Sequence, residues 1–185
     1  MKRFFSFFLF STLLLLLAGC STPEVKQSLV TYSSKNIVGF DNKTILIDYQ
    51  FLPAMYRIGS YAAMNNVKVV VTSSFRTPNQ KLTGTIVPPA KNSNHLAGHA
   101  IDMNVEYNGV LYESDSLKKA NLKNLPPNVR NFISAVRHDK GLQWGGDFLT
   151  EDPVHIDDGL NDDMVAWQQR VDACQYGIVG IDSKQ

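Results

Sequence analysis

The ten residues from Ser93 to Asp102 constrain this chain most, because they place a histidine and an aspartate seven positions apart. Side chains alternate between the two faces of a strand, so an odd separation would send His95 and Asp102 to opposite faces. The two can converge only if the chain bends between them, and Gly98 permits that bend at low steric cost. We therefore expect His95 on a loop and Asp102 within the strand that follows.

A histidine and an aspartate that converge in this way suggest a metal site. Neutral imidazole and carboxylate are both zinc ligands, and a catalytic zinc site has three protein ligands and one open position. The candidate third ligand is His155, in a short expected strand. Asp152 is the candidate general base and Glu151 is its rival, because zinc lowers the pKa of a bound water to about 7 and a nearby carboxylate can then take its proton.

Three further side chains have candidate roles around such a site. Arg76 follows a valine-rich segment and begins a long loop. Its guanidinium would hold a carbonyl oxygen as negative charge develops there, or clamp a carboxylate, and a surface ion pair is the alternative. We expect His99 to be structural, since strand alternation turns it away from Asp102. Asp157 shares a strand face with His155, so it is a candidate acceptor for an imidazole N–H.

The N-terminal residues are expected to lie outside the fold. Lys2 and Arg3 precede an apolar run at 4–17, and a Leu-Ala-Gly-Cys sequence ends at Cys20, which is typical of a secretory signal. The run is shorter than the roughly 20 residues that span a bilayer. It resembles the bacterial lipoprotein box, in which the cysteine is acylated and becomes the first mature residue; ordinary export is the alternative. We predict a lipoprotein signal peptide at 1–19, a tether at 20–36 and the folded domain at 37–180.

The residue after Cys20 bears on the destination of the protein. It is Ser21 rather than an aspartate, which resembles an outer-membrane address in bacteria with two membranes. We therefore expect a lipid-anchored protein of the bacterial cell envelope that faces the periplasm, at the outer membrane if the organism has one. With Cys20 lipidated, Cys174 has no intrachain disulfide partner, and we expect it to be a small buried apolar residue on a helix. The formal net charge of +1 gives no basis for nucleic-acid binding, and we expect a monomer.

The order of the periodic segments predicts an α+β domain with a small antiparallel sheet and flanking helices. Apolar residues at helical spacing predict helices at 51–65, 127–139 and 162–176. Alternating or valine-rich segments predict strands at 37–49, 67–72, 100–107, 110–112, 142–144 and 154–157, with a hairpin turn at Asn108-Gly109. Between these lie a long segment at 77–94 with a short helical turn at 78–82, a polar irregular segment at 113–126, and nine frayed residues at the end.

Three motifs, in this order along the chain, resemble a known family. They are Ser-Phe-Arg-Thr-Pro-x-Gln at 74–80, Ser-x-His-x-x-Gly-x-Ala-x-Asp at 93–102, and Trp-Gly-Gly-Asp-Phe followed by Asp-Pro-x-His at 144–155. These motifs are similar to those of the zinc peptidases of bacterial cell-wall stem peptides. That family includes D-alanyl-D-alanine carboxypeptidases, dipeptidases and L-alanyl-D-glutamate endopeptidases. The resemblance covers roughly residues 50–158.

The resemblance implies a zinc peptidase of peptidoglycan stem peptides, with a fold similar to that of the D-alanyl-D-alanine carboxypeptidases and the zinc site at the sheet. The domain at 37–180 is then the metallopeptidase domain. The roles that it implies are zinc binding for His95, Asp102 and His155, catalysis for Asp152 and Arg76, and substrate binding for Gln80 and Ser93.

The sequence departs from the family pattern in two places. Many members carry glutamate where this chain has Asp152, and the aspartate looks more like the endopeptidase branch, so both a D,D-carboxypeptidase and an L-Ala-D-Glu endopeptidase stay open. Phe75 stands where tyrosine is common, and Ser74 where glycine is common. The alternative from another class is a catalytically inactive envelope-binding lipoprotein that retains the metal site. A closed structural zinc site would need a fourth protein ligand. His99 is the nearby candidate, but its spacing from the other ligands in the sequence is poor for this role.

Overall fold

The computed structural model describes residues 28–80 and 90–182. The predicted signal peptide, the lipidation site at Cys20 and the first part of the predicted tether lie outside the described residues. Among the residues that are described, no helix has both the length and the apolar character needed to cross a membrane.

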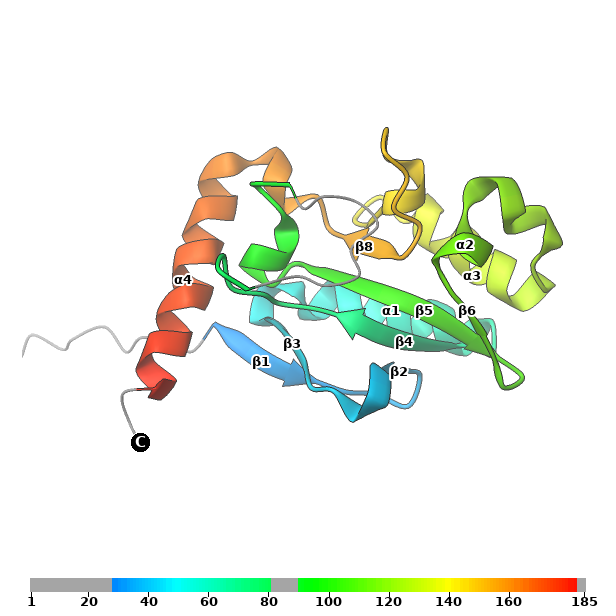
Figure 1. Cartoon of the computed structure of the whole chain (residues 1–185), viewed down its shortest axis with the longest axis horizontal. Helices are drawn as coiled ribbons and strands as arrows, with labels where there is room; N and C mark the ends of the chain where they lie inside the picture. Colours follow the sequence, from blue (N-terminus) through cyan, green and yellow to red (C-terminus); the bar gives the residue numbers. More distant parts are fainter. Residues whose placement is uncertain (1–27, 81–89, 183–185) are drawn as a thin grey trace, which may run out of the picture.

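The centre of the fold is a six-stranded mixed sheet of order β2-β4-β5-β8-β7, with β6 paired to β5 (Figure 1). Its strands are β2 (Ile37–Gly39), β4 (Lys68–Ser73), β5 (Ala100–Tyr107), β6 (Val110–Tyr112), β7 (Gln143–Trp144) and β8 (His155–Asp157). The α+β class is confirmed. The prediction of an antiparallel sheet is wrong at one edge, where β2 and β4 are parallel. The chain between them is a long crossover that includes a helix, which is the connection that a parallel pair requires.

The folded part of the chain begins earlier than predicted. Strand β1 (Leu29–Tyr32) pairs with β3 (Ile45–Asp48) in a separate two-stranded antiparallel sheet. Because Leu29 and Tyr32 are buried, the prediction of a tether up to residue 36 is wrong from residue 28 onward. A four-residue strand among polar neighbours carries little periodic signal, and its pairing partner decides its structure.

The single strand predicted at 37–49 is in fact β2 and β3, separated by the short 3-10 helix η1 (Phe40–Asn42). Asp41 and Asn42 both have positive φ angles, which break the extended backbone. The short helical turn predicted at 78–82 lies only partly within the described residues. There the Gln80 N–H donates to the Thr77 carbonyl in a simple turn.

The three predicted helices are present as α1 (Leu52–Met64), α3 (Pro127–His138) and α4 (Met164–Asp182). Helix α4 continues beyond residue 176, so the prediction of nine frayed residues is wrong as far as Asp182. The segment at 113–126, predicted to be irregular, forms the short helices α2 (Ser114–Leu117) and η4 (Lys119–Asn124). Figure 1 shows α4 at one end of the molecule, and α2 and α3 at the other.

The main hydrophobic core lies between the sheet and the helices α1 and α3. Its fully buried side chains include Phe51, Ile58, Met103, Phe132 and Ile156. Burial of apolar area is the dominant stabilising contribution in a domain of this kind. In β5 both neighbours of Asp102 are fully buried, so this core fixes the strand that presents the carboxylate.

Candidate metal centre

The side chains of His95, Asp102 and His155 converge at one point of the sheet. One potential ligand atom from each lies within 4.8 Å of the other two. The Nε2 atom of His95 and the Nδ1 atom of His155 are each 3.1 Å from Oδ1 of Asp102. The structure thus brings together the three residues for which the sequence suggests zinc binding.

Local backbone structure explains this convergence. His95 lies in the short 3-10 helix η3 (Asn94–Ala97), which ends at Gly98 in the left-handed conformation with φ of 71°. This is the bend that the sequence required between His95 and Asp102. Asp102 and His155 are directly opposite each other on the antiparallel strands β5 and β8. Side chains at such paired positions share a face of the sheet and lie close together.

The hydrogen bonds of the two histidines determine which ring nitrogen faces the centre. The Nδ1 atom of His95 is 2.7 Å from the Ser74 carbonyl oxygen, which can only accept, so Nδ1 carries the proton. The Nε2 atom of His155 is 2.8 Å from Oδ2 of Asp157. When both rings are neutral, as metal binding requires, each directs its other nitrogen, with a lone pair, at the Asp102 carboxylate.

Three electron pairs that face one another repel unless a positive charge lies between them. A proton or a metal cation would provide that charge, and two imidazoles with one carboxylate are a ligand set that zinc uses. The hydrogen bonds from the outer ring nitrogens to a backbone carbonyl and a carboxylate are also those that fix metal-binding histidines. The residues of this site therefore fit a zinc ion.

The pKa values in the centre show how strongly it favours positive charge. Burial by itself raises the pKa of Asp102, but His95 and His155 outweigh it and hold that pKa far below its ordinary value. Burial lowers the pKa of His155, whereas Asp102 and Asp157 raise it more strongly, to about 10. The two carboxylates thus stabilise a cation at this position.

Asp152 lies beside the centre on the loop before β8. Its N–H donates to the Gly145 carbonyl over 2.8 Å, and its own carbonyl accepts from the His155 N–H over 3.1 Å. Burial and then the Asp102 charge raise the pKa of the Asp152 carboxyl, while His155 and His95 act in the opposite direction. The rival Glu151 is directed elsewhere, because its Oε1 accepts from the Lys119 N–H over 2.6 Å. The Asp152 carboxyl is therefore under the electrostatic influence of the centre, whereas the Glu151 carboxylate is held by the backbone at Lys119.

Arg76 lies next to the backbone of a ligand residue. The backbone N–H of Arg76 donates to the His95 carbonyl over 3.1 Å, and the Arg76 side chain is half-buried. Burial lowers the pKa of the Arg76 guanidinium, and the Asp102 charge raises it. The ion pairs within 28–80 and 90–182 do not include Arg76. Its charge is therefore near the centre and is not neutralised by a described carboxylate.

The two predicted substrate-binding residues are not brought to the centre by any described side-chain contact. Gln80 is exposed and immediately precedes the residues 81–89, which lie outside the described structure. Ser93 is the N-cap of η3, and its carbonyl accepts from Nε1 of Trp167 over 3.3 Å. Both roles stay predictions.

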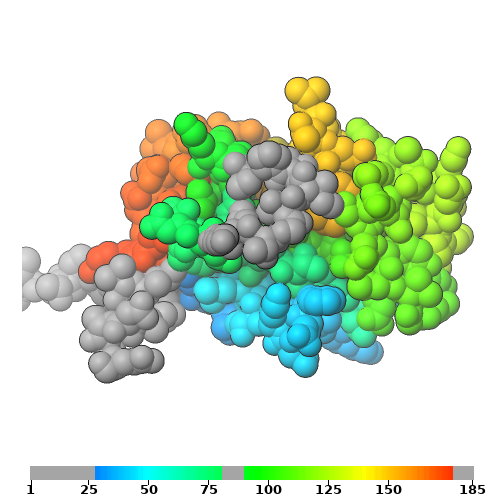
Figure 2. Space-filling model, in the orientation of Figure 1, coloured from blue at the N-terminus to red at the C-terminus, as the bar shows by residue number. Residues whose placement is uncertain are grey.

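The sequence did not identify Phe148 as part of the site. Its ring centroid is 5.7 Å from that of His155, and the next residue, Leu149, is fully exposed. Figure 2 shows the segment that follows η5 (Gly145–Asp147) projecting from the surface. Phe148 belongs to the Trp-Gly-Gly-Asp-Phe motif, so the motif itself was a signal for an aromatic side chain beside the centre.

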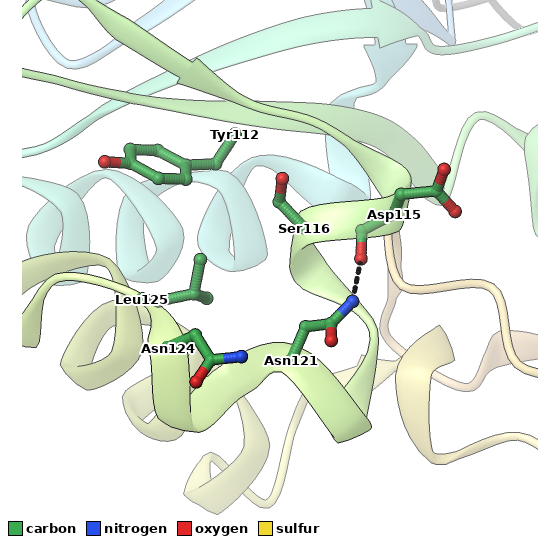
Figure 3. A pocket seen from close by; sticks show the side chains of 6 residues that line it. All are labelled: Tyr112, Asp115, Ser116, Asn121, Asn124 and Leu125. Carbon is green, nitrogen blue, oxygen red and sulfur yellow. Dashed lines mark hydrogen bonds between the residues drawn. The ribbon is translucent and has the colours of Figure 1, made fainter.

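A separate pocket of about 320 Å³ lies between β6 and the helices α2 and η4 (Figure 3). Within it the Asn121 amide donates to the Asp115 carbonyl over 2.7 Å. Its lining residues are Tyr112, Asp115, Ser116, Asn121, Asn124 and Leu125. None of them is a predicted site residue, so this pocket is distinct from the metal centre.

The sequence and the structure were compared with known protein families and solved structures to test the predicted family resemblance. The family model described as D-alanyl-D-alanine carboxypeptidase matches residues 88–158, which include all three candidate ligands and Asp152. This confirms the predicted resemblance. A solved structure, the L-Ala D-Glu endopeptidase ChiX of Serratia marcescens, has 21% sequence identity and a TM-score of 0.37, and the match covers 60% of this chain and 81% of that one. No curated protein matches the chain.

Proposed function

We propose that this chain is a zinc-dependent peptidase that hydrolyses a peptide bond in peptidoglycan stem peptides, as a D,D-carboxypeptidase or an L-Ala-D-Glu endopeptidase. The match to the D-alanyl-D-alanine carboxypeptidase family supports the peptidase class. The observation that carries the zinc site is the convergence of His95, Asp102 and His155. Among the described residues this group has three members, which is the number of protein ligands in a catalytic zinc site.

Zinc held by these residues would supply a Lewis acid that polarises a carbonyl and makes water acidic at neutral pH. Asp152 takes the proton from the attacking water as its oxygen bonds to the carbonyl carbon. It then returns that proton to the nitrogen as the carbon–nitrogen bond breaks. The raised pKa of Asp152 suits both steps, because a base that must also release its proton works best with a pKa close to the operating pH.

Arg76 and the neighbours of the ligands have separate tasks. The Arg76 guanidinium offsets the negative charge that develops on the carbonyl oxygen of the scissile bond, or holds a substrate carboxylate. Ser74 and Asp157 orient the two imidazoles through their outer nitrogens. Phe148 supplies an apolar surface beside His155 for the substrate.

Two substitutions with a matched control test this proposal. Purified protein is incubated with sacculi, the released fragments are identified by mass, and bound zinc is measured. We expect Asp152→Asn to keep zinc and lose cleavage, and His155→Ala to lose both. Glu151→Gln, the control, keeps both, because Glu151 binds the Lys119 backbone instead. An inactive envelope-binding protein would release no fragments in any form. Cleavage by His155→Ala at the rate of the parent protein would refute the assignment.

We also propose that the protein is lipid-anchored through Cys20 in the bacterial cell envelope, facing the periplasm. The support is the Leu-Ala-Gly-Cys sequence after an apolar run. Metabolic labelling with a radioactive fatty acid tests it: the parent chain incorporates label and Cys20→Ser does not. Label retained in Cys20→Ser would refute the anchor.

A further inference from the structure

A second group of charged side chains, centred on the buried His99 and Asp48, adjoins the segments that carry the histidine ligands. The Nδ1 atom of His99 is 2.8 Å from Oδ2 of Asp158, and its Nε2 atom is 3.7 Å from Oδ1 of Asp48. Asp48 is fully buried, and the guanidinium of Arg170 in α4 donates to its Oδ2. The hydroxyl of Ser28 donates to the same oxygen over 2.5 Å. His99 thus lies between two carboxylates, one of which is tied to the terminal helix.

The side chains of this group join the two segments that carry the histidine ligands. The backbone N–H of His99 donates to the Asn94 carbonyl over 2.9 Å, and this bond closes the turn that holds His95. Asp158 directly follows Asp157, whose carboxylate binds His155. The side-chain bond between His99 and Asp158 therefore links the turn of one ligand to the strand of the other, although 59 positions separate the two residues.

The other side of His99 is held less directly, because its Nε2 atom has no hydrogen-bond partner among the described residues and only a 3.7 Å ionic contact with Asp48. The Asp48 N–H donates to the Gly98 carbonyl over 3.0 Å, and a Cβ atom on Gly98 would lie 2.6 Å from that nitrogen. The Asp48 backbone thus rests directly against the bend between His95 and Asp102. The buried Asp48 carboxylate accepts hydrogen bonds from Ser28, the Gln50 N–H and Arg170, which hold this segment in place. The Asp48 segment therefore gives the bend beside His99 a fixed support.

We infer that His99 is a positioning residue for the metal centre, which holds the His95 turn and the His155 strand at the spacing that zinc requires. This inference rests on the proposed zinc site and assigns His99 no contact with the ion. A site whose ligands are already held in place binds its metal more tightly, because no ordering remains to be done when the ion arrives. Outer partners of metal ligands typically contribute about 10–100-fold to metal affinity.

The test measures the zinc dissociation constant by competition with a chelator, together with the visible absorption of the cobalt-substituted protein. We expect His99→Ala to bind zinc about 10–100-fold more weakly and to change the cobalt spectrum. In His99→Asn the amide nitrogen is as many bonds from Cα as Nδ1 is, so it can still donate to Asp158 and recovers most of the affinity. Asp158→Ala, which removes the acceptor of the His99 Nδ1–H, repeats the test with the same expected loss of zinc affinity if His99→Ala does not fold.

The matched control is Asp139→Asn. The Asp139 carboxylate is also largely buried, and it binds Arg57 and Tyr61 at a distance from the centre. We expect this variant to lower the melting temperature without a change in zinc affinity or cobalt spectrum. If His99→Ala behaves as Asp139→Asn does, His99 is merely structural and the inference is overturned. A parent protein that does not bind zinc overturns it too, whereas one that binds zinc but leaves sacculi intact refutes only the peptidase proposal.

Discussion

The Nε2 atom of His155 lies 2.8 Å from Oδ2 of Asp157, two residues further along β8. This contact fixes the ring so that Nδ1 faces Asp102. In Asp157→Asn the amide group would direct a donor at the ring N–H, since its one oxygen is held by the Gly159 N–H. We expect zinc affinity to fall about 10–100-fold, measured by competition with a chelator. Asp162→Asn, on an exposed residue, should leave the affinity unchanged. Equal affinities in both variants would contradict the role of Asp157.

Gly145 lies too close to the loop of Asp152 to carry a side chain. A Cβ atom on Gly145 would be 2.3 Å from the Asp152 carbonyl oxygen and 2.8 Å from Cβ of His155. We expect Gly145→Ala to displace this loop, to lower the free energy of unfolding by about 1–3 kcal/mol, and to reduce cleavage of sacculi. Denaturation in urea and the cleavage assay measure the two effects.

The control for Gly145 is a glycine with room for a methyl group. A Cβ atom on Gly59, within α1, would meet its nearest neighbour, Cδ1 of Ile37, at an ordinary 3.5 Å. Because alanine has the higher helix propensity, Gly59→Ala should raise the free energy of unfolding by about 0.5–1 kcal/mol. A stabilising effect of Gly145→Ala would show that the loop tolerates the methyl group.

Arg76 is expected to act on the reaction and not on the metal. We expect Arg76→Ala to lower kcat/KM for a stem-peptide substrate by about 10²–10³-fold, because one positive charge is removed from the developing oxyanion. Bound zinc should stay at the parent level. Arg130→Ala, on the exposed surface of α3, should retain full activity. Loss of zinc in Arg76→Ala would instead indicate a structural role next to His95.

The stability of the fold should depend on pH through His99. Burial by itself lowers the pKa of His99, but Asp158 and Asp48 outweigh it and raise that pKa above its ordinary value of about 6.5. The protonated ring therefore contributes stability that is complete below that value and is lost as the pH rises through the raised pKa. The groups that face this pair of carboxylates from α4 are Arg170 and Cys174.

The measurement is the free energy of unfolding of the parent protein minus that of His99→Asn, between about pH 6 and pH 9. We expect this difference to decrease as the pH rises, because only the parent loses a proton at position 99. Contributions from other groups, including His155, cancel in the subtraction. A difference that is constant over this range would contradict the prediction.

Cys174 was predicted to be a small buried apolar residue, and it is buried. Its surroundings are polar, however, since Sγ lies 3.2 Å from Oδ2 of Asp48 and 3.2 Å from the Ala97 carbonyl oxygen. Burial and the Asp48 charge raise the pKa of the thiol to about 12. In the Cys20→Ser chain, which has one thiol, we expect alkylation at neutral pH to require denaturant. Rapid labelling of the native protein would contradict this.

Local sequence predicted those parts of the fold that depend on neighbours along the chain. The apolar spacing of Phe132 and Val136 predicted α3, and Asn108-Gly109 predicted the hairpin between β5 and β6. The strand Leu29–Tyr32 was missed, because it exists only through its pairing with β3. The parallel pairing of β2 with β4 was missed for the same reason.

The sequence by itself determined which side chains are candidate ligands, and it required a bend at Gly98 between His95 and Asp102. Only the tertiary structure decided which atoms of those side chains face one another. The ring of His95 is fixed by the Ser74 carbonyl, and the charge of Asp48 is balanced by Arg170, 122 positions away. Periodicity and turn chemistry act over a few residues, whereas these contacts follow from strand register and helix packing, which bring distant segments together.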